Sequence, residues 1–254
     1  MPTAILIDGA FFVKRFRCIE PHNRYNGKRA AELAFRLALA HLREPGAHMP
    51  AKRRDLYRIF FYDCPPLEKR LHNPISKRSI DFGKSQEAVF RTEMHAVLRQ
   101  KRKLALRLGH LASDTPWTIK VPVIESLLKG RLSFEDLQES DVVPHARQKG
   151  VDMRIGIDIS SLALKKQVDQ IVLVAGDADF VPAAKLARRE GVDFILDPLW
   201  QSVPAALNEH IDGLRTTCAR PRPAGEGGQD LATDGGIASS LQSDPCSSSA
   251  PSRP

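Results

Sequence analysis

The sequence lacks any long apolar run and has few cysteines. No stretch reaches the roughly 18 consecutive apolar residues that a membrane span requires, so we expect no membrane partner. The N-terminus shows no basic region followed by an apolar one, which would mark a secretory signal, and we expect a cytoplasmic protein. The four cysteines do not stand in the closely spaced pairs of a zinc site. Zinc chemistry is therefore not indicated.

Acidic residues are fewer than basic ones, and histidine follows no pattern. The chain has 38 Lys and Arg against 30 Asp and Glu, a formal net charge of +8. Such a charge is typical of proteins that bind polyanions, among them nucleic acids. The eight histidines are scattered outside any acidic motif, so we assign none of them a catalytic role.

Short apolar segments alternate with amphipathic helical patterns along most of the chain. Segments rich in β-branched or aromatic residues predict strands at 4–7, 55–62, 104–108, 169–175 and 192–196. Apolar residues at helical spacing predict helices at 28–42, 85–99, 151–164, 179–190 and 203–209. Residues 118–123 can add a further strand beside 104–108. This alternation predicts a doubly wound α/β domain, a three-layer α/β/α sandwich with a mainly parallel central sheet.

Two of the predicted strands lead directly into aspartates. Asp8 ends the first strand, and Asp177 and Asp179 come just after the central one. The carboxyl ends of parallel strands share one edge of a sheet, where ligands bind, and Asp152 at the start of a helix can supply a third side. Like charges this close need a cation or a shared proton. We therefore predict that Asp8, Asp152, Asp177 and Asp179 are catalytic residues and ligands of Mg²⁺ or Mn²⁺, which prefer oxygen ligands.

Two further aspartates receive lesser roles. Asp158 lies six residues after Asp152 and so on a different face of the helix. We expect it to contact the metal ligands without binding the metal itself, or to be a structural partner. Asp63 also ends a strand, but an aspartate before a turn is common, and we leave it outside the predicted site.

Three segments together resemble the motifs of the NYN domain family. They are Ile7–Phe12 (IDGAFF), Gln148–Asp158 (QKGVDMRIGID) and Val174–Pro182 (VAGDADFVP). That family includes the LabA-like (DUF88) proteins and belongs to the PIN-like nuclease superfamily. The resemblance extends over residues 3–215, and it implies a PIN-like domain at 1–215 that acts on RNA. One departure is Phe11, where many members carry an Asn that can contact metal or substrate.

A carboxylate site of this kind predicts phosphodiester hydrolysis. Bound ions lower the pKa of a water and stabilise the attacking and leaving oxygens, so the resemblance implies a Mg²⁺- or Mn²⁺-dependent ribonuclease. A haloacid-dehalogenase-like phosphatase is an alternative, but it needs Asp-x-Asp after the first strand, and Ala10 stands there. The other alternative is a catalytically weak or inactive module that binds RNA or protein with the same fold.

Basic residues near the predicted strand and helix junctions are candidates for holding a nucleic-acid backbone. They are Lys14, Arg15, Arg17, Arg147, Lys149 and Arg154. The aromatic residues between the first three are expected to belong mainly to the core. The sequence leaves a homodimer open. From residue 216 the composition shifts to Gly, Pro, Ser, Asp and Gln, which predicts a disordered tail at 216–254.

Overall fold

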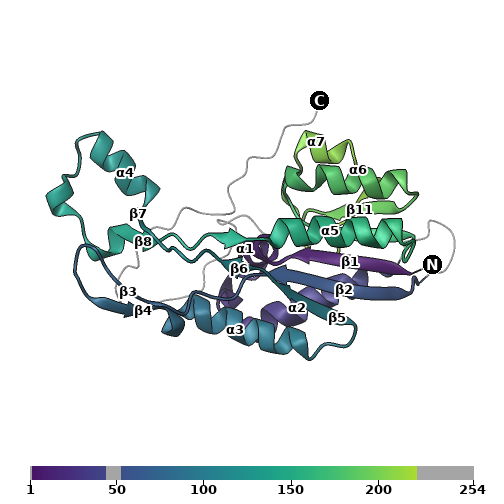
Figure 1. Ribbon diagram of the computed structural model, residues 1–254, viewed down its shortest axis with the longest axis horizontal. Coiled ribbons are helices and arrows are strands. Elements are labelled where there is room, and N and C mark those ends of the chain that lie inside the picture. Colours follow the sequence, from purple (N-terminus) through teal and green to yellow (C-terminus); the bar gives the residue numbers. More distant parts are fainter. Residues whose placement is uncertain (1, 44–52, 222–254) are drawn as a thin grey trace, which may run out of the picture.

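The fold is described from a computed structural model, which defines residues 2–43 and 53–221. Its central element is a six-stranded parallel sheet in the order β12-β11-β10-β1-β2-β5 (Figure 1). The strands are β1 (Thr3–Asp8), β2 (Leu56–Asp63), β5 (Leu104–Leu108), β10 (Gln170–Val174), β11 (Asp193–Asp197) and β12 (Gly213–Leu214). Most of the tail predicted at 216–254 lies outside the described residues.

Helices cover both faces of this sheet. One face is covered by α1 (Gly9–Ile19), α2 (Gly27–Ala40) and α3 (Gln86–Arg99), and the other by α5 (Val151–Leu164) and α6 (Val181–Arg189). The short α7 (Ala205–Asn208) packs beside α6 (Figure 1). The structure is therefore the predicted three-layer α/β/α sandwich, and α5 has the predicted bounds.

Strand β1 shows why the sheet is buried on both sides. All of its residues are buried, and successive side chains point to opposite faces. Ile5 and Ile7 join the core beneath α1, α2 and α3, whereas Ala4 and Leu6 join the core beneath α5 and α6. A continuous apolar run is what a central parallel strand requires.

The strand order has a topological switch between β1 and β10. From β1 the chain proceeds outward to β2 and β5, and it then returns to place β10 on the other side of β1. Ile7 of β1 lies opposite Val174 of β10 in the register. In open α/β sheets the crevice at the carboxyl ends of two such strands is the usual place for a ligand.

Two insertions extend from the carboxyl edge of the sheet and form an arm, seen at the left in Figure 1. The first, between β2 and α3, contains the antiparallel pair β3 (Arg70–His72) and β4 (Ser79–Asp81). The second, between β5 and α5, contains β6 (His110–Leu111), β7 (Trp117–Ile119), α4 (Val121–Leu128), β8 (Val142–Pro144) and β9 (Gln148–Lys149). Short 3-10 helices occupy Pro21–Asn23, Phe82–Lys84, Phe134–Asp136, Glu139–Asp141 and Ala178–Phe180.

The arm corrects one expectation. Residues 118–123 do not add a strand beside β5, because β7 pairs with β8 in a separate two-stranded sheet. Pro122 lies in the first turn of α4, where its missing N–H costs nothing, so the strand ends at Ile119 and a helix follows. No helix in the described ranges has the length and apolar character needed to cross a membrane.

Candidate active site

Four neighbouring strands of the sheet lead into aspartates at the carboxyl edge. Asp63 ends β2, Asp8 ends β1, Asp177 follows β10 and Asp197 ends β11. The two outer positions, Asp63 and Asp197, are fully buried. The inner two, Asp8 and Asp177, stand on either side of the topological switch. Their surroundings differ, and this difference separates structural acids from candidate functional ones.

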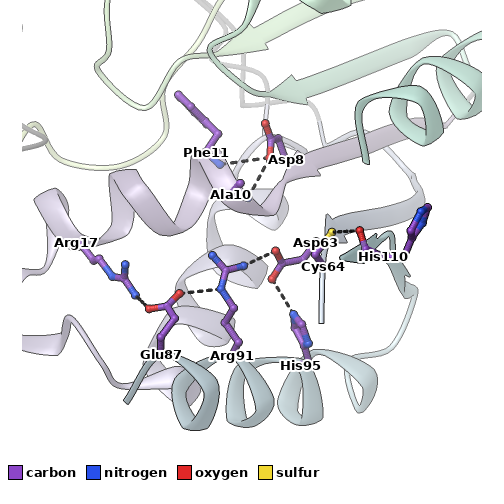
Figure 2. A network of polar contacts seen from close by, with 10 residues as sticks. All are labelled: Asp8, Ala10, Phe11, Arg17, Asp63, Cys64, Glu87, Arg91, His95 and His110. Atoms are coloured by element: carbon purple, nitrogen blue, oxygen red, sulfur yellow. Dashed lines mark hydrogen bonds and ion pairs between the residues drawn. The ribbon is translucent and has the colours of Figure 1, made fainter. Parts of the chain in front are cut away.

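Asp63 is compensated by positive and polar partners (Figure 2). His95 Nε2 lies 2.7 Å from Asp63 Oδ2, and Arg91 makes an ion pair with Oδ1. Arg91 is held in turn by Glu87 at 2.8 Å, and Glu87 pairs with Arg17. Buried carboxylates are stable only when paired in this way.

Asp197 has a similar arrangement on the other side of the site. His41 Nε2 lies 2.8 Å from its Oδ2, and the backbone N–H of Leu199 donates to Oδ1 at 2.9 Å. Arg215 Nε donates to His41 Nδ1 at 3.2 Å. Because Nδ1 accepts, Nε2 carries the proton that is donated to Asp197.

Within the described residues Asp8 makes no such ion pair, and it is instead the N-cap of α1. Its Oδ1 accepts from the backbone N–H groups of Ala10 at 3.0 Å and Phe11 at 3.2 Å (Figure 2). Only 9% of the residue is exposed. Burial is the main cause that raises the pKa of Asp8 to about 6, and the charges of Asp152 and Asp63 raise it further against the lowering effect of the two N–H groups.

Glycine at position 9 lets the helix begin so close to the sheet. A Cβ atom there would lie 2.4 Å from the carbonyl oxygen of Tyr62 on β2. Any side chain would push α1 away, and with it the cap that orients Asp8. The sequence Asp8-Gly9 therefore fixes the direction of this carboxylate.

Asp152 interacts electrostatically with the aspartates at the ends of both inner strands, Asp8 and Asp177. It lies in the first turn of α5, next to Gly150, whose φ of 79° requires glycine's freedom in the left-handed region. Burial raises the pKa of Asp152, and the charges of Asp177 and Asp179 raise it further. Asp177 accepts a hydrogen bond from the Asp179 N–H at 3.2 Å and so caps the 3-10 helix that follows.

The four predicted ligands thus form a chain of interacting charges, from Asp8 through Asp152 to Asp177 and Asp179. Within the described ranges, however, no group of three or more His, Cys, Asp or Glu residues is assembled closely enough to hold a metal ion. The donors are of the chemical type that Mg²⁺ or Mn²⁺ takes, and their mutual repulsion is what a cation would relieve. Their assignment as ligands stays a prediction.

Asp158 lies elsewhere on α5 and acts on the sheet. It accepts from the Tyr62 hydroxyl at 2.8 Å and from Arg107 at 3.2 Å. Burial, followed by the charge of Asp158, raises the pKa of Tyr62. In this structure Asp158 therefore fastens α5 to β2 and β5.

The predicted basic surface is only partly present. Arg15 is buried, and its Nε donates to the carbonyl of Leu199 at 2.9 Å, so it is not available to a nucleic acid. A basic residue inside a run of cations looks like a surface residue in the sequence, but here it faces the loop after β11. Lys14, Lys149 and Arg154 are exposed as expected.

The other two predicted cations have protein partners. Arg17 pairs with Glu87 and lies over the rings of Tyr25 and Phe90, each 5.3 Å away. Arg147 pairs with Asp114 at 2.7 Å, in an exposed contact. Exposed pairs of this kind are weak, so Arg147 can still exchange Asp114 for a phosphate.

Phe11 stands at the position where many members of the resembled family carry a polar Asn. A Cβ atom at Gly176 would lie 2.5 Å from Cε2 of Phe11, so the ring packs directly on the loop that leads to Asp177. The departure from the motif therefore replaces a polar contact with an apolar one. It leaves the carboxylates in place.

A part of the chain that contains three of the candidate carboxylates matches a known domain family. Residues 117–212 match the model of the NYN domain. NYN domains are part of the PIN-like nuclease superfamily, whose members are generally nucleases and typically use divalent metals. The matched part of the chain includes Asp152, Asp177 and Asp179 but not β1 with Asp8.

The other comparisons add little to this. No curated protein matches the chain. A crystal structure of a protein of unknown function from Vibrio parahaemolyticus is similar at 15% identity, over 84% of this chain and 90% of that one, with a TM-score of 0.39. We base no argument on that likeness.

Proposed function

We propose that this protein is a metal-dependent ribonuclease that hydrolyses phosphodiester bonds at the carboxyl edge of its sheet. The observation that supports this most is the contrast among the strand-end aspartates. Asp63 and Asp197 have cationic or histidine partners in the protein. Burial raises the pKa values of Asp8 and Asp152. The charge of Asp152 raises that of Asp8 further, and the charges of Asp177 and Asp179 raise that of Asp152. A structural role alone gives no reason to keep such repulsion.

The carboxylates of Asp8, Asp152, Asp177 and Asp179 are the residues that would hold Mg²⁺ or Mn²⁺. A bound divalent ion of this kind supplies a water of lowered pKa and stabilises negative charge on phosphate oxygens. The fixed cap geometry of Asp8 orients one carboxylate before any ligand arrives. The loop after β10 places Asp177 and Asp179 on the opposite side of the switch.

Exposed cations next to this edge suit an anionic substrate. Lys14 lies on α1 just after Asp8, and Lys149 and Arg154 flank Asp152. Lysine and arginine here can hold phosphates on either side of the cleaved bond and so fix the strand across the carboxylates. Arg15 has no part in this contact because it is buried.

The test is a cleavage assay with labelled RNA, single-stranded DNA and duplex DNA, each with Mn²⁺, with Mg²⁺ and with EDTA. The proposal expects RNA to be cleaved with either metal and to stay intact in EDTA. RNA that is bound in a salt-dependent manner but never cleaved would overturn the nuclease and favour the regulatory RNA-binding module. Cleavage of DNA in preference to RNA would correct the substrate.

A further inference from the structure

The loop after β11 is held in an unfavourable backbone conformation. Leu199 has a φ of 45° and Trp200 a φ of 67°. Both are bulky residues in the left-handed region, which disfavours any side chain with a Cβ atom. Conformations of this kind cost about 1–3 kcal/mol each and persist where the surroundings impose them, often at ligand sites.

Several buried groups impose this conformation. Leu199 is itself fully buried. Its N–H donates to Asp197 at 2.9 Å, and its carbonyl accepts from Arg15 at 2.9 Å. Asp197 is held in turn by His41. A buried arginine and a buried aspartate–histidine pair therefore fix the direction of one short loop.

The loop presents an indole ring to solvent. Trp200 is 46% exposed although its Nε1 donates to the carbonyl of Cys218 at 2.9 Å. The guanidinium of Arg220 lies 5.9 Å from the ring centroid. The ring is therefore held in one orientation, with a cation beside it, and a large part of it stays open.

The loop that carries this ring lies beside the loop that leads to Asp177. Asp197 is opposite Val174 in the register of β11 and β10, and each strand is followed by a loop at the carboxyl edge. A Cβ atom at Gly176 would lie 3.2 Å from Gln201 Nε2, so the residue after Trp200 lies close to the residue before Asp177. The two loops are therefore neighbours at the carboxyl edge.

We propose that Trp200, with Arg220 beside it, is a stacking subsite for an unpaired nucleobase of the substrate, next to the phosphate held at the carboxylates. This inference rests on the proposed function. A fixed aromatic ring binds the flat face of any base, and a neighbouring cation suits the phosphate attached to it. Bases inside a duplex are already stacked on one another, so the subsite selects single-stranded RNA.

The test compares Trp200→Leu, Trp200→Phe and the matched control Trp117→Leu, which removes the other tryptophan, on the arm. Binding of a short labelled RNA strand, alone and annealed to its complement, is measured in Ca²⁺ to limit cleavage. Trp200→Leu should weaken single-strand binding on the order of 5- to 150-fold, the value of one base stacked on an aromatic ring. Trp200→Phe and Trp117→Leu should bind like the wild type, and duplex binding should not change.

A spectroscopic readout tests the contact itself. In a Trp117→Phe protein, Trp200 is the reporter, and single-stranded RNA should quench its fluorescence. If Trp200→Leu unfolds, Trp200→Asn replaces it, because Asn tolerates the left-handed region. Unchanged affinity in the variants, or no quenching, would overturn the subsite while Mn²⁺-dependent cleavage still supports the nuclease. Quenching and lost affinity without any cleavage would keep the subsite and overturn the nuclease.

Discussion

Asp8 and Asp63 end neighbouring strands, yet replacing each by Asn should change stability in opposite directions. At pH 7.5 without divalent ions, Asp8 carries a charge that the folded protein disfavours. The rise of its pKa from 3.8 to about 6 corresponds to about 3 kcal/mol of unfavourable free energy for the ionised folded state. Asn keeps the cap of α1, because its Oδ1 accepts the same N–H groups. Asp8→Asn should therefore stabilise the metal-free protein by about 1–3 kcal/mol.

Asp63→Asn is the contrasting variant. It leaves the buried His95 and the largely buried Arg91 without their carboxylate partner. Breaking one member of a buried pair costs about 3–5 kcal/mol, so this protein should be less stable by about that amount. The two variants remove the same charge one strand apart, which controls for any general effect of net charge.

The assay is urea denaturation in EDTA, from which the midpoint and the slope give the free energy of unfolding. The Asp8 effect should depend on pH. Since its pKa is higher in the folded state, its protonated form favours folding, and this contribution is lost as pH rises from about 4 through about 6. The difference between wild type and Asp8→Asn should therefore vanish near pH 4. A destabilised Asp8→Asn at pH 7.5 would refute the reasoning about uncompensated charge.

Three further predictions concern metal binding, substrate binding and the buried Arg15. Mg²⁺ or Mn²⁺ should raise the melting temperature of the wild type, because a ligand that binds only the folded state stabilises it; Asp177→Asn should lose most of that rise, and an equal response in both proteins would place the ions elsewhere. Lys14→Ala should reduce the salt dependence of RNA affinity by roughly 0.7 in the logarithmic slope, the value of one phosphate contact on a single strand. Arg15→Ala should instead lower the melting temperature, because it removes the buried hydrogen bond to the carbonyl of Leu199. An Arg15→Ala protein with an unchanged melting temperature and a reduced salt slope of RNA affinity would show that Arg15 contacts the RNA.

The sequence indicated the parts of the site that depend on local pattern. The position of Asp8 at the end of β1 and of Asp152 at the start of α5 follows from apolar periodicity, which gave the bounds of α5 correctly. Strand alternation with helices then requires that the parallel strand ends meet at one edge. These inferences need no knowledge of distant contacts.

The parts that sequence reasoning missed depend on residues far apart in the chain. Asp63 and Asp197 are hydrogen-bonded to His95 and His41, which lie 32 and 156 residues away and belong to no motif. Arg15 stands among exposed cations, and only the loop after β11 explains why it is buried. Pairings of this kind are set by tertiary packing and leave no periodic signal.

The most direct measurement is the rate of RNA cleavage in Mn²⁺ by the wild type, Asp177→Asn and Asp55→Asn. Asp177→Asn changes a candidate carboxylate by a few atoms. Asp55→Asn makes the same change in an exposed residue just before β2, at the opposite edge of the sheet. The account predicts loss of most of the activity in Asp177→Asn, with wild-type rates in Asp55→Asn. Equal cleavage by all three folded proteins would contradict it.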